Sequence, residues 1–348
     1  MEQLMGIILH AIGGFSSASF YVPSYKIKRW AWQTYWISLG FVAWIIMPTV
    51  GGLLTTPDLF GIFKAISFGG MIWTYLFGVL WGFGGLMAGL GLRYLGLSLG
   101  QSISLGVCAI VGTLVPAFID HKAGMLFTTI PGAVILFGFV ICLTGIAFCG
   151  YAGVLKDRLL TDYQKKESVK EFSAFKGLIM AILGGVMSAF MALAINAGSS
   201  ISDQALKSGT QKVFMNIPIF VLALGGGFTT NFVYTIIMNI RNKSFGDYVH
   251  HPKKILLTNY LFSILSGLMW YGQFFFYGMG ATKMGKYGFA SWTLHMATII
   301  IFSNLWGLWL KEWVLVSART KRYLWLGISL LILSVICIGV GNHMAGSA

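Results

Sequence analysis

Charged residues are scarce in this chain, at 10% of its 348 residues, against roughly 25% in soluble domains. The longest polar stretch covers only residues 156–176, while an independent soluble domain needs roughly 50 residues or more. The scarcity of charge therefore argues against a water-soluble protein. A net charge of +14 would suggest nucleic-acid binding in a soluble chain. Here the basic residues flank apolar stretches, so we expect no nucleic acid as a partner.

Cysteines and catalytic motifs are also scarce. The four cysteines, Cys108, Cys142, Cys149 and Cys337, lie inside apolar stretches and form neither a metal-ligand spacing nor an evident disulfide pair. The sequence has no His-Glu-x-x-His motif, and its glycine-rich stretches lack the Lys-Ser/Thr of a phosphate-binding loop. We therefore predict no enzymatic activity, no cofactor and no metal site.

What the chain does contain is ten apolar stretches, each about 20 residues long, which is the length of a helix that crosses a bilayer. The backbone cannot be hydrated in lipid, so such spans must be helices. The sequence predicts an all-α integral membrane protein with ten transmembrane helices. The predicted spans are Leu4–Val22, Thr34–Leu54, Ile72–Gly91, Ser98–Ile119, Pro131–Ala152, Phe175–Gly198, Val213–Met238, Leu257–Ala281, Gly288–Leu310 and Tyr323–His343.

The distribution of basic residues predicts the orientation. Loops that follow odd-numbered spans hold 18 of the 24 Lys and Arg residues, and loops that follow even-numbered spans hold 6. By the positive-inside rule the first group faces the cytoplasm, so both termini are predicted outside. The first span lacks a basic leading region and a small-residue cleavage site, so we expect it to be retained.

The two halves of the chain resemble each other. A shift of 171 residues aligns Gly13-Gly14 with Gly184-Gly185, and a shift of 189 residues aligns Trp81 with Trp270. We therefore predict two five-helix repeats, residues 1–155 and 175–348, joined by a cytoplasmic linker at residues 156–174. Because five is odd, the second repeat enters the membrane inverted. Inverted repeats are typical of transporters that expose a central site alternately to each side, and a channel or a membrane enzyme needs no such symmetry.

Several motifs along the chain are long or unusual in composition. They are Leu9-His10-x-x-Gly13-Gly14, Phe20-Tyr21-x-Pro23-x-x-Lys26, Trp30-x-Trp32, Trp81-Gly82-x-Gly84, Arg93-Tyr94-Leu95-Gly96-x-Ser98-x-Gly100, Gly112-Thr113-Leu114, Gly267-Leu268-Met269-Trp270-Tyr271, Gln273-Phe274-Phe275-Phe276-Tyr277, Ser291-Trp292-x-Leu294-His295-Met296 and Gly307-Leu308-x-x-Lys311-Glu312-Trp313. In these motifs the chain resembles the L-rhamnose–proton symporter family of the drug/metabolite transporter superfamily. The resemblance implies ten helices in inverted repeats in a bacterial inner membrane, and import of L-rhamnose with protons.

One position departs from that family. An acidic residue often follows the second tryptophan of Trp-x-Trp there, whereas this chain has Gln33. The resemblance therefore implies L-rhamnose or a closely related sugar. An exporter of drugs or metabolites from the same superfamily is the alternative, because residues do not reveal the direction of transport. Whether the carrier forms a homodimer is left open.

Proton coupling requires a titratable group near the substrate, and such groups are few inside the spans. His10 and His295 are predicted at matching depths, roughly 10 Å from the same side, and their ordinary pKa suits proton exchange near neutral pH. The alternative is a pair of neutral histidines bonded to neighbouring helices. Glu312, at the cytoplasmic end of the ninth span, is the third candidate; the alternative is an interfacial ion pair with Lys311 or a loop base. Asp120 ends the fourth span similarly.

Sugar recognition requires flat apolar surfaces together with amide or hydroxyl groups. The predicted sugar-binding residues share a location inside the spans and are Trp270, Tyr271, Gln273, Trp81, Trp292 (with Ser291) and Asn231, followed by Tyr234 and Asn196. Core packing is the alternative for the aromatic residues, and polar bonding between helices is the alternative for the amides. Pro48, Pro116 and Pro218 are candidate helix breaks.

Overall fold

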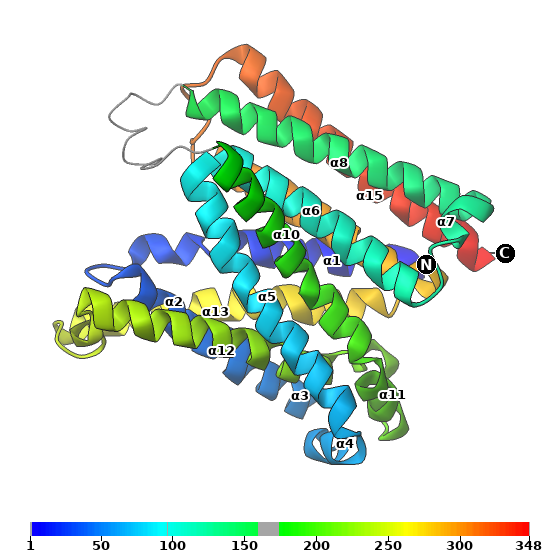
Figure 1. The fold of residues 1–348 in the computed structure, drawn as a ribbon, viewed down its shortest axis with the longest axis horizontal. Coiled ribbons are helices and arrows are strands. Elements are labelled where there is room, and N and C mark those ends of the chain that lie inside the picture. Colours follow the sequence, from blue (N-terminus) through cyan, green and yellow to red (C-terminus); the bar gives the residue numbers. More distant parts are fainter. Residues whose placement is uncertain (1, 96, 159–173, 348) are drawn as a thin grey trace.

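The chain folds into a bundle of long helices (Figure 1), described here from a computed structural model that covers residues 2–95, 97–158 and 174–347. Within these ranges the structure is helical and has no strand. The long segments are α1 (Glu2–Ser19), α2 (Trp32–Phe41) continued by η2 (Val42–Ile46) and α3 (Met47–Thr55), α5 (Phe68–Leu95), α6 (Leu97–Ile119), α8 (Ile130–Asp157), α10 (Ala174–Ala197), α12 (Ile217–Asn242), α13 (Lys253–Ala281), α14 (Ser291–Trp309) and α15 (Ala318–Ser347).

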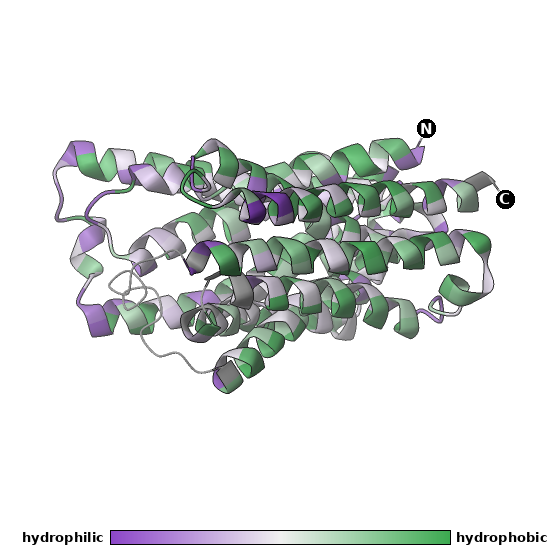
Figure 2. Cartoon of the chain, turned by 90° about the horizontal axis from the view of Figure 1, so that it is seen from above, coloured by the Kyte–Doolittle hydropathy of each residue, from purple (hydrophilic) through white to green (hydrophobic). Residues whose placement is uncertain are grey.

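Short helices and turns join these segments. They are η1 (Val22–Lys26), α4 (Leu59–Ala65), α7 (Met125–Thr128), α11 (Ser199–Lys207), η3 (Lys212–Phe214), η4 (Phe245–Tyr248) and η5 (Gly285–Ala290). The N- and C-termini lie at the same end of the bundle (Figure 1), which we call the termini end. Figure 2 shows hydrophobic residues along the lengths of the helices. Large apolar side chains also face outward, among them Phe175 and Ile130 at more than 70% exposure, as a lipid-facing surface requires.

In the described part of the chain, nine helical segments are long and apolar enough to cross a membrane. They confirm the prediction of an all-α integral membrane protein and correspond to every predicted span except Gly288–Leu310. That region holds α14, which has 19 residues but carries polar side chains, including His295 and Asn304. Every residue from Ser291 to Thr298 is buried. The polar side chains in the first half of α14, including His295, are thus enclosed by the other helices, whereas Asn304 in the second half is half-buried.

Pro48, a predicted helix break, distorts the second span without interrupting it. Its pyrrolidine nitrogen has no proton to donate, so the preceding turn cannot keep the regular α-helical bonding. The structure has a π-helical turn, η2, at Val42–Ile46, and α3 starts at Met47 with Pro48 in its first turn. Pro218 instead opens α12, and Pro116 lies inside a continuous α6.

Helix packing has a regular scheme when each span is matched with the one five spans later. In this matching α5 corresponds to α13, and α10 corresponds to α1. α5 packs against α10, and in the same way α13 packs against α1. The α6–α10 contact is likewise matched by α14–α1, and the α5–α12 contact by α13–α2. α8 packs against its own counterpart, α15.

Candidate functional site

The structure brings the two predicted histidines together. His10 of α1 and His295 of α14 are fully buried, and their ring centroids are 5.9 Å apart. None of their four ring nitrogens has a hydrogen-bond partner among the described residues. A buried imidazole without partners is costly, and a pair of them in a membrane bundle is typical of a functional site.

Close helix contacts hold this pair in place. A β-carbon at Gly13 would lie 2.9 Å from the Gln273 carbonyl oxygen and 3.1 Å from Cε1 of His295. The Thr298 hydroxyl donates to the carbonyl oxygens of His10 at 3.1 Å and His295 at 2.8 Å. Glycine lets α1 approach α13 and α14, and Thr298 then fixes the two histidine backbones relative to each other.

Tyr277 completes the histidine site, and the sequence reasoning missed it. Its ring centroid lies 5.2 Å from that of His10 and 5.2 Å from that of His295. Its other neighbour is Trp292, at 5.6 Å between ring centroids. The available signal was spacing, because Tyr277 follows Gln273 by four residues and so shares its face of α13.

The repeat-related tryptophans also meet. The ring centroids of Trp81 and Trp270 are 5.6 Å apart, and Trp44 of η2 lies 5.3 Å from Trp270 and 6.3 Å from Trp81. Phe274 packs against Trp270 at 5.3 Å. The indole nitrogen of Trp44 is buried without a partner among the described residues. Trp44 was missed because no motif or repeat singles it out.

The predicted amides are bonded within the protein. Gln273 accepts from the Ser17 hydroxyl at 2.9 Å and donates to the Trp270 carbonyl oxygen at 3.0 Å, which joins α1 to α13. Asn231 accepts from the indole nitrogen of Trp36 at 3.0 Å and donates to the Gly227 carbonyl oxygen at 2.9 Å. These bonds are those expected of polar groups that hold helices together.

The remaining sugar candidates differ in their surroundings. The Tyr271 hydroxyl and the Ser291 hydroxyl are buried without partners in the described structure. Tyr271 is buried against α3, where a β-carbon at Gly51 would contact its hydroxyl. Tyr234 is half-buried on α12. Asn196 of α10 donates to the Asp120 carboxylate at 2.9 Å.

Two cavities approach the site from opposite ends of the bundle. The Tyr277 cavity, about 220 Å³, lies at the termini end, and its lining includes Gly112, Asp120, Lys122, Asn196 and Tyr277. The Glu312 cavity, about 260 Å³, lies at the far end, and its lining includes Gln101, Leu105, Lys156, Asn304 and Glu312.

Trp292 occupies the level between the two cavities. Along α6, the Glu312 cavity reaches Leu105 and the Tyr277 cavity begins at Gly112. Between these positions the Trp292 indole nitrogen donates to the Cys108 carbonyl oxygen at 3.2 Å. The ring lies so close to Gly112 that a β-carbon there would overlap it. Trp292 therefore contacts α6 between the levels that the two cavities reach along this helix.

Glu312 lies in the turn that follows α14. Its carboxylate pairs with Lys156 of α8 at 3.0 Å, and the Lys156 ammonium also lies 4.8 Å above the Trp313 ring. The Glu312 side chain is 45% exposed. The partner is thus a base at the start of the linker rather than Lys311, in keeping with the interfacial ion-pair alternative.

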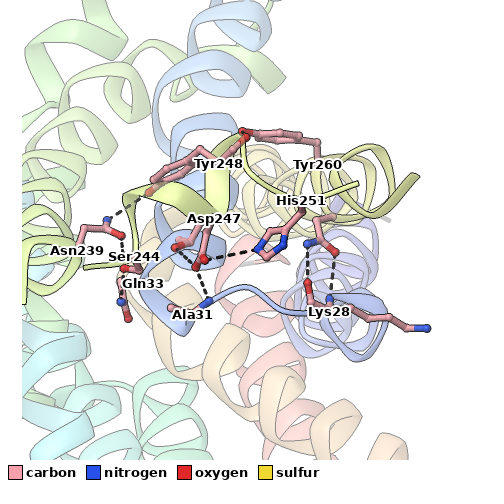
Figure 3. Close-up of polar contacts among 11 residues, drawn as sticks. Lys28, Ala31, Gln33, Asn239, Ser244, Asp247, Tyr248, His251 and Tyr260 are labelled. Carbon is pink, nitrogen blue, oxygen red and sulfur yellow. Dashed lines mark hydrogen bonds and ion pairs between the residues drawn. The ribbon is translucent and has the colours of Figure 1, made fainter. Parts of the chain in front are cut away.

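Gln33 belongs to a polar network at the far end of the bundle (Figure 3), which the sequence reasoning missed. Its amide donates to the Ser244 hydroxyl at 2.7 Å, and Ser244 donates to Asn239 at 2.7 Å. Asp247 accepts from the backbone nitrogen of Ala31 at 2.8 Å and from the Thr34 hydroxyl at 2.9 Å, and so caps the start of α2.

The same network extends to α13 and η4. Asn259 exchanges two hydrogen bonds with the backbone of Lys28, at 3.0 and 2.8 Å, and the Tyr260 hydroxyl donates to the Tyr248 carbonyl oxygen at 3.0 Å. The Tyr248 hydroxyl accepts from the Asn239 amide at 3.2 Å, and burial raises the pKa of this phenol. The network ties α2, α12 and α13 together at this end.

The long apolar helices, together with a buried histidine pair whose ring nitrogens have no hydrogen-bond partner in the described part of the chain, define the class: an integral membrane protein built like a transporter. Comparison with known proteins identifies the family. Residues 2–345 match the model of the L-rhamnose-proton symport protein family, and the chain belongs to this family.

Relatives match along almost the whole chain. The L-rhamnose-proton symporter of Yersinia pestis (strain Pestoides F) is 36% identical over 341 residues, which is 97% of this chain and 98% of the relative. The symporter of the same name from Cronobacter sakazakii (strain ATCC BAA-894) is 36% identical over 340 residues, 97% of each protein.

Proposed function

We propose that this protein imports L-rhamnose, or a closely related sugar, together with protons. Its relatives over 97% of the chain are named L-rhamnose-proton symporters. The observation that carries the proposal is the buried pair of His10 and His295, whose four ring nitrogens lack hydrogen-bond partners among the residues that the structure describes. A proton-coupled carrier needs such a group, one that binds and releases a proton inside the membrane.

The architecture proposed for this activity has ten spans in two inverted five-helix repeats, residues 1–155 and 175–348, with α14 as the ninth span. The matched packing of α5–α10 with α13–α1, and of α6–α10 with α14–α1, supports this arrangement. Two termini at one end of the bundle agree with an even number of spans. The residues of the 156–174 linker from 159 to 173 lie outside the described structure.

We place the protein in a bacterial inner membrane with both termini outside. The support is the unequal sharing of Lys and Arg between the two sets of loops. In this orientation the Tyr277 cavity faces outward, and the Glu312 cavity and the network around Asp247 face the cytoplasm. Membership of the drug/metabolite transporter superfamily is part of the same proposal.

Alternating access follows from the position of Trp292. The barrier around its bond to Cys108 separates an outer cavity from an inner one. Transport therefore requires this barrier to open on one side of the substrate and another to close on its other side. His10 and His295 hold the proton. Glu312, exposed and paired with Lys156, lies where protons and sugar leave for the cytoplasm.

For the sugar itself we retain Trp81, Trp270, Tyr271, Gln273, Trp292 and Asn231 as candidates. None of the six lines the Tyr277 cavity, so they would meet the sugar only beyond that cavity, on its way through the bundle. Tyr271 is the favoured member, because its hydroxyl is buried without a partner among the described residues. Gln273 and Asn231 already have protein partners for their amides, which favours a role in holding helices together. The names of the relatives do not favour the alternative, an exporter.

The direct test adds L-rhamnose outside proteoliposomes that contain the purified protein and records external pH in a weak buffer. Symport predicts alkalinisation that starts with the sugar, is absent with an unrelated sugar, and is abolished by a protonophore. Labelled rhamnose that enters without any pH change would indicate a facilitator. Absence of rhamnose entry and of a pH change would refute the assignment of the sugar.

A further inference from the structure

The Tyr277 cavity has a polar mouth and an apolar floor. At the mouth, the Asp120 carboxylate accepts from the Asn196 amide at 2.9 Å and pairs with the Lys122 ammonium at 3.3 Å. The Asp120 and Lys122 side chains are 31% and 48% exposed, so the mouth meets solvent. Further inside the bundle, the lining includes Gly112 of α6 and the buried Tyr277 of α13.

The dimensions suit one small neutral ligand. A volume of about 220 Å³ equals the share of roughly seven water molecules in liquid water, which is room for one six-carbon sugar ring. The pairing leaves the Asp120 carboxylate with free lone pairs, and hydroxyl groups bond strongly to a carboxylate. Aromatic and aliphatic walls suit the C–H faces of a sugar.

The Tyr277 side chain separates this cavity from the histidines. One side of it lines the cavity, and its ring contacts both His10 and His295 at 5.2 Å between centroids. A ligand seated on the cavity floor would touch Tyr277 before it could touch either histidine. The Tyr277 ring is therefore placed to connect the binding of a ligand in the cavity with the protonation of His10 and His295.

We propose that the Tyr277 cavity is the outward-facing sugar site, in which Asp120 and Asn196 bind sugar hydroxyls and the Tyr277 ring couples bound sugar to the histidine pair. This inference rests on the proposed function. Asp120 and Asn196 are binding residues, and Tyr277 is a positioning residue whose role depends on its ring. Because coupling between two sites is reciprocal, loss of the ring weakens both directions of the linkage.

Two readouts separate these roles in proteoliposomes: the KM for L-rhamnose uptake and the accumulation ratio under a fixed inward proton gradient at saturating sugar. Asp120→Ala and Asn196→Ala should raise the KM by about tenfold, as expected for one lost bond to the sugar, and leave the accumulation ratio unchanged. Tyr277→Leu should reduce the accumulation ratio toward one, and Tyr277→Phe should keep it. Asp203→Ala is the matched control, an exposed acidic residue of α11 outside the cavity lining, and should change neither.

The outcomes are distinguishable. If wild-type protein does not accumulate rhamnose, the proposed function fails. If wild type accumulates it but the Asp120 and Asn196 variants keep the wild-type KM, or Tyr277→Leu keeps full accumulation, this inference is overturned. If the Asp120→Ala variant does not purify as a folded protein, Asp120→Asn replaces it. The KM for L-rhamnose is then expected to rise in the Asp120→Asn variant as well, and a wild-type KM overturns the inference.

Discussion

Replacing Gly112 with alanine perturbs the barrier between the two cavities. The added β-carbon would overlap three atoms of the Trp292 indole, of which Cε2 would be 3.0 Å away. Ordinary carbon contacts begin at roughly 3.5 Å, so the ring must move. A moved ring cannot keep the 3.2 Å hydrogen bond to the Cys108 carbonyl oxygen.

The expected cost combines two contributions. Overpacking of a core position costs about 1–3 kcal/mol, and the lost hydrogen bond costs about 1 kcal/mol. We therefore expect Gly112→Ala to lower the free energy of unfolding by about 2–4 kcal/mol, a fall in Tm of roughly 5–10 °C on the scale of medium-sized domains. Because Trp292 lies between the cavities, the initial rate of rhamnose uptake should fall as well.

The assay is thermal denaturation of the purified protein in detergent, followed by tryptophan fluorescence, with uptake measured in parallel. Gly106→Ala is the matched control on the same helix, since its β-carbon would meet only Cγ2 of Ile146, at 3.9 Å. Alanine is also the better helix former, so this control should lose no stability. Equal Tm and equal uptake for the two variants would refute the placement of Trp292 against Gly112.

Three further predictions concern polar contacts. Gln273→Ala removes the bond to Ser17 and should lower the free energy of unfolding by about 1–3 kcal/mol, with the KM for sugar changed less than twofold (about 0.4 kcal/mol). Asp247→Ala leaves the Ala31 nitrogen and the Thr34 hydroxyl without their acceptor and should cost about 2 kcal/mol, measured as a lower Tm. Glu312→Gln breaks an exposed ion pair with Lys156, so a double-mutant cycle with Lys156→Gln should give a coupling free energy below about 1 kcal/mol.

Each of these three predictions has a result that would contradict it. A tenfold rise in KM for Gln273→Ala would make that amide a sugar ligand. A wild-type Tm for Asp247→Ala would mean that its bonds contribute nothing to stability. Complete loss of proton-driven accumulation in Glu312→Gln, with the protein folded, would make this carboxylate part of the proton path rather than an interfacial pair.

Patterns that depend on local spacing were predictable from the sequence. Span length is set by bilayer thickness, so the nine long apolar helices of the described ranges could be located, and α14 was located despite the polar residues that lower its hydropathy. The depths of His10 and His295 could be counted from their span ends, and the structure brings their rings within 5.9 Å. The irregular turn before Pro48 follows from the missing N–H of proline.

Contacts made across the bundle were not predictable. Lys156 and Glu312 are joined only because α8 and the turn after α14 end side by side. Gln33 meets Ser244 through the geometry of the turn after α12, which no span length or repeat specifies. Trp44 joins Trp81 and Trp270 because η2 turns it inward, and a π-helical turn changes the face that each residue presents.

The central claim is that the His10–His295 pair couples rhamnose uptake to protons. The most direct test is accumulation of labelled L-rhamnose in proteoliposomes under an inward gradient of one pH unit, which can sustain about tenfold accumulation at one proton per sugar. We predict that wild-type protein accumulates the sugar and that folded His10→Gln and His295→Gln variants only equilibrate it. Accumulation by both variants at the wild-type level would contradict the account.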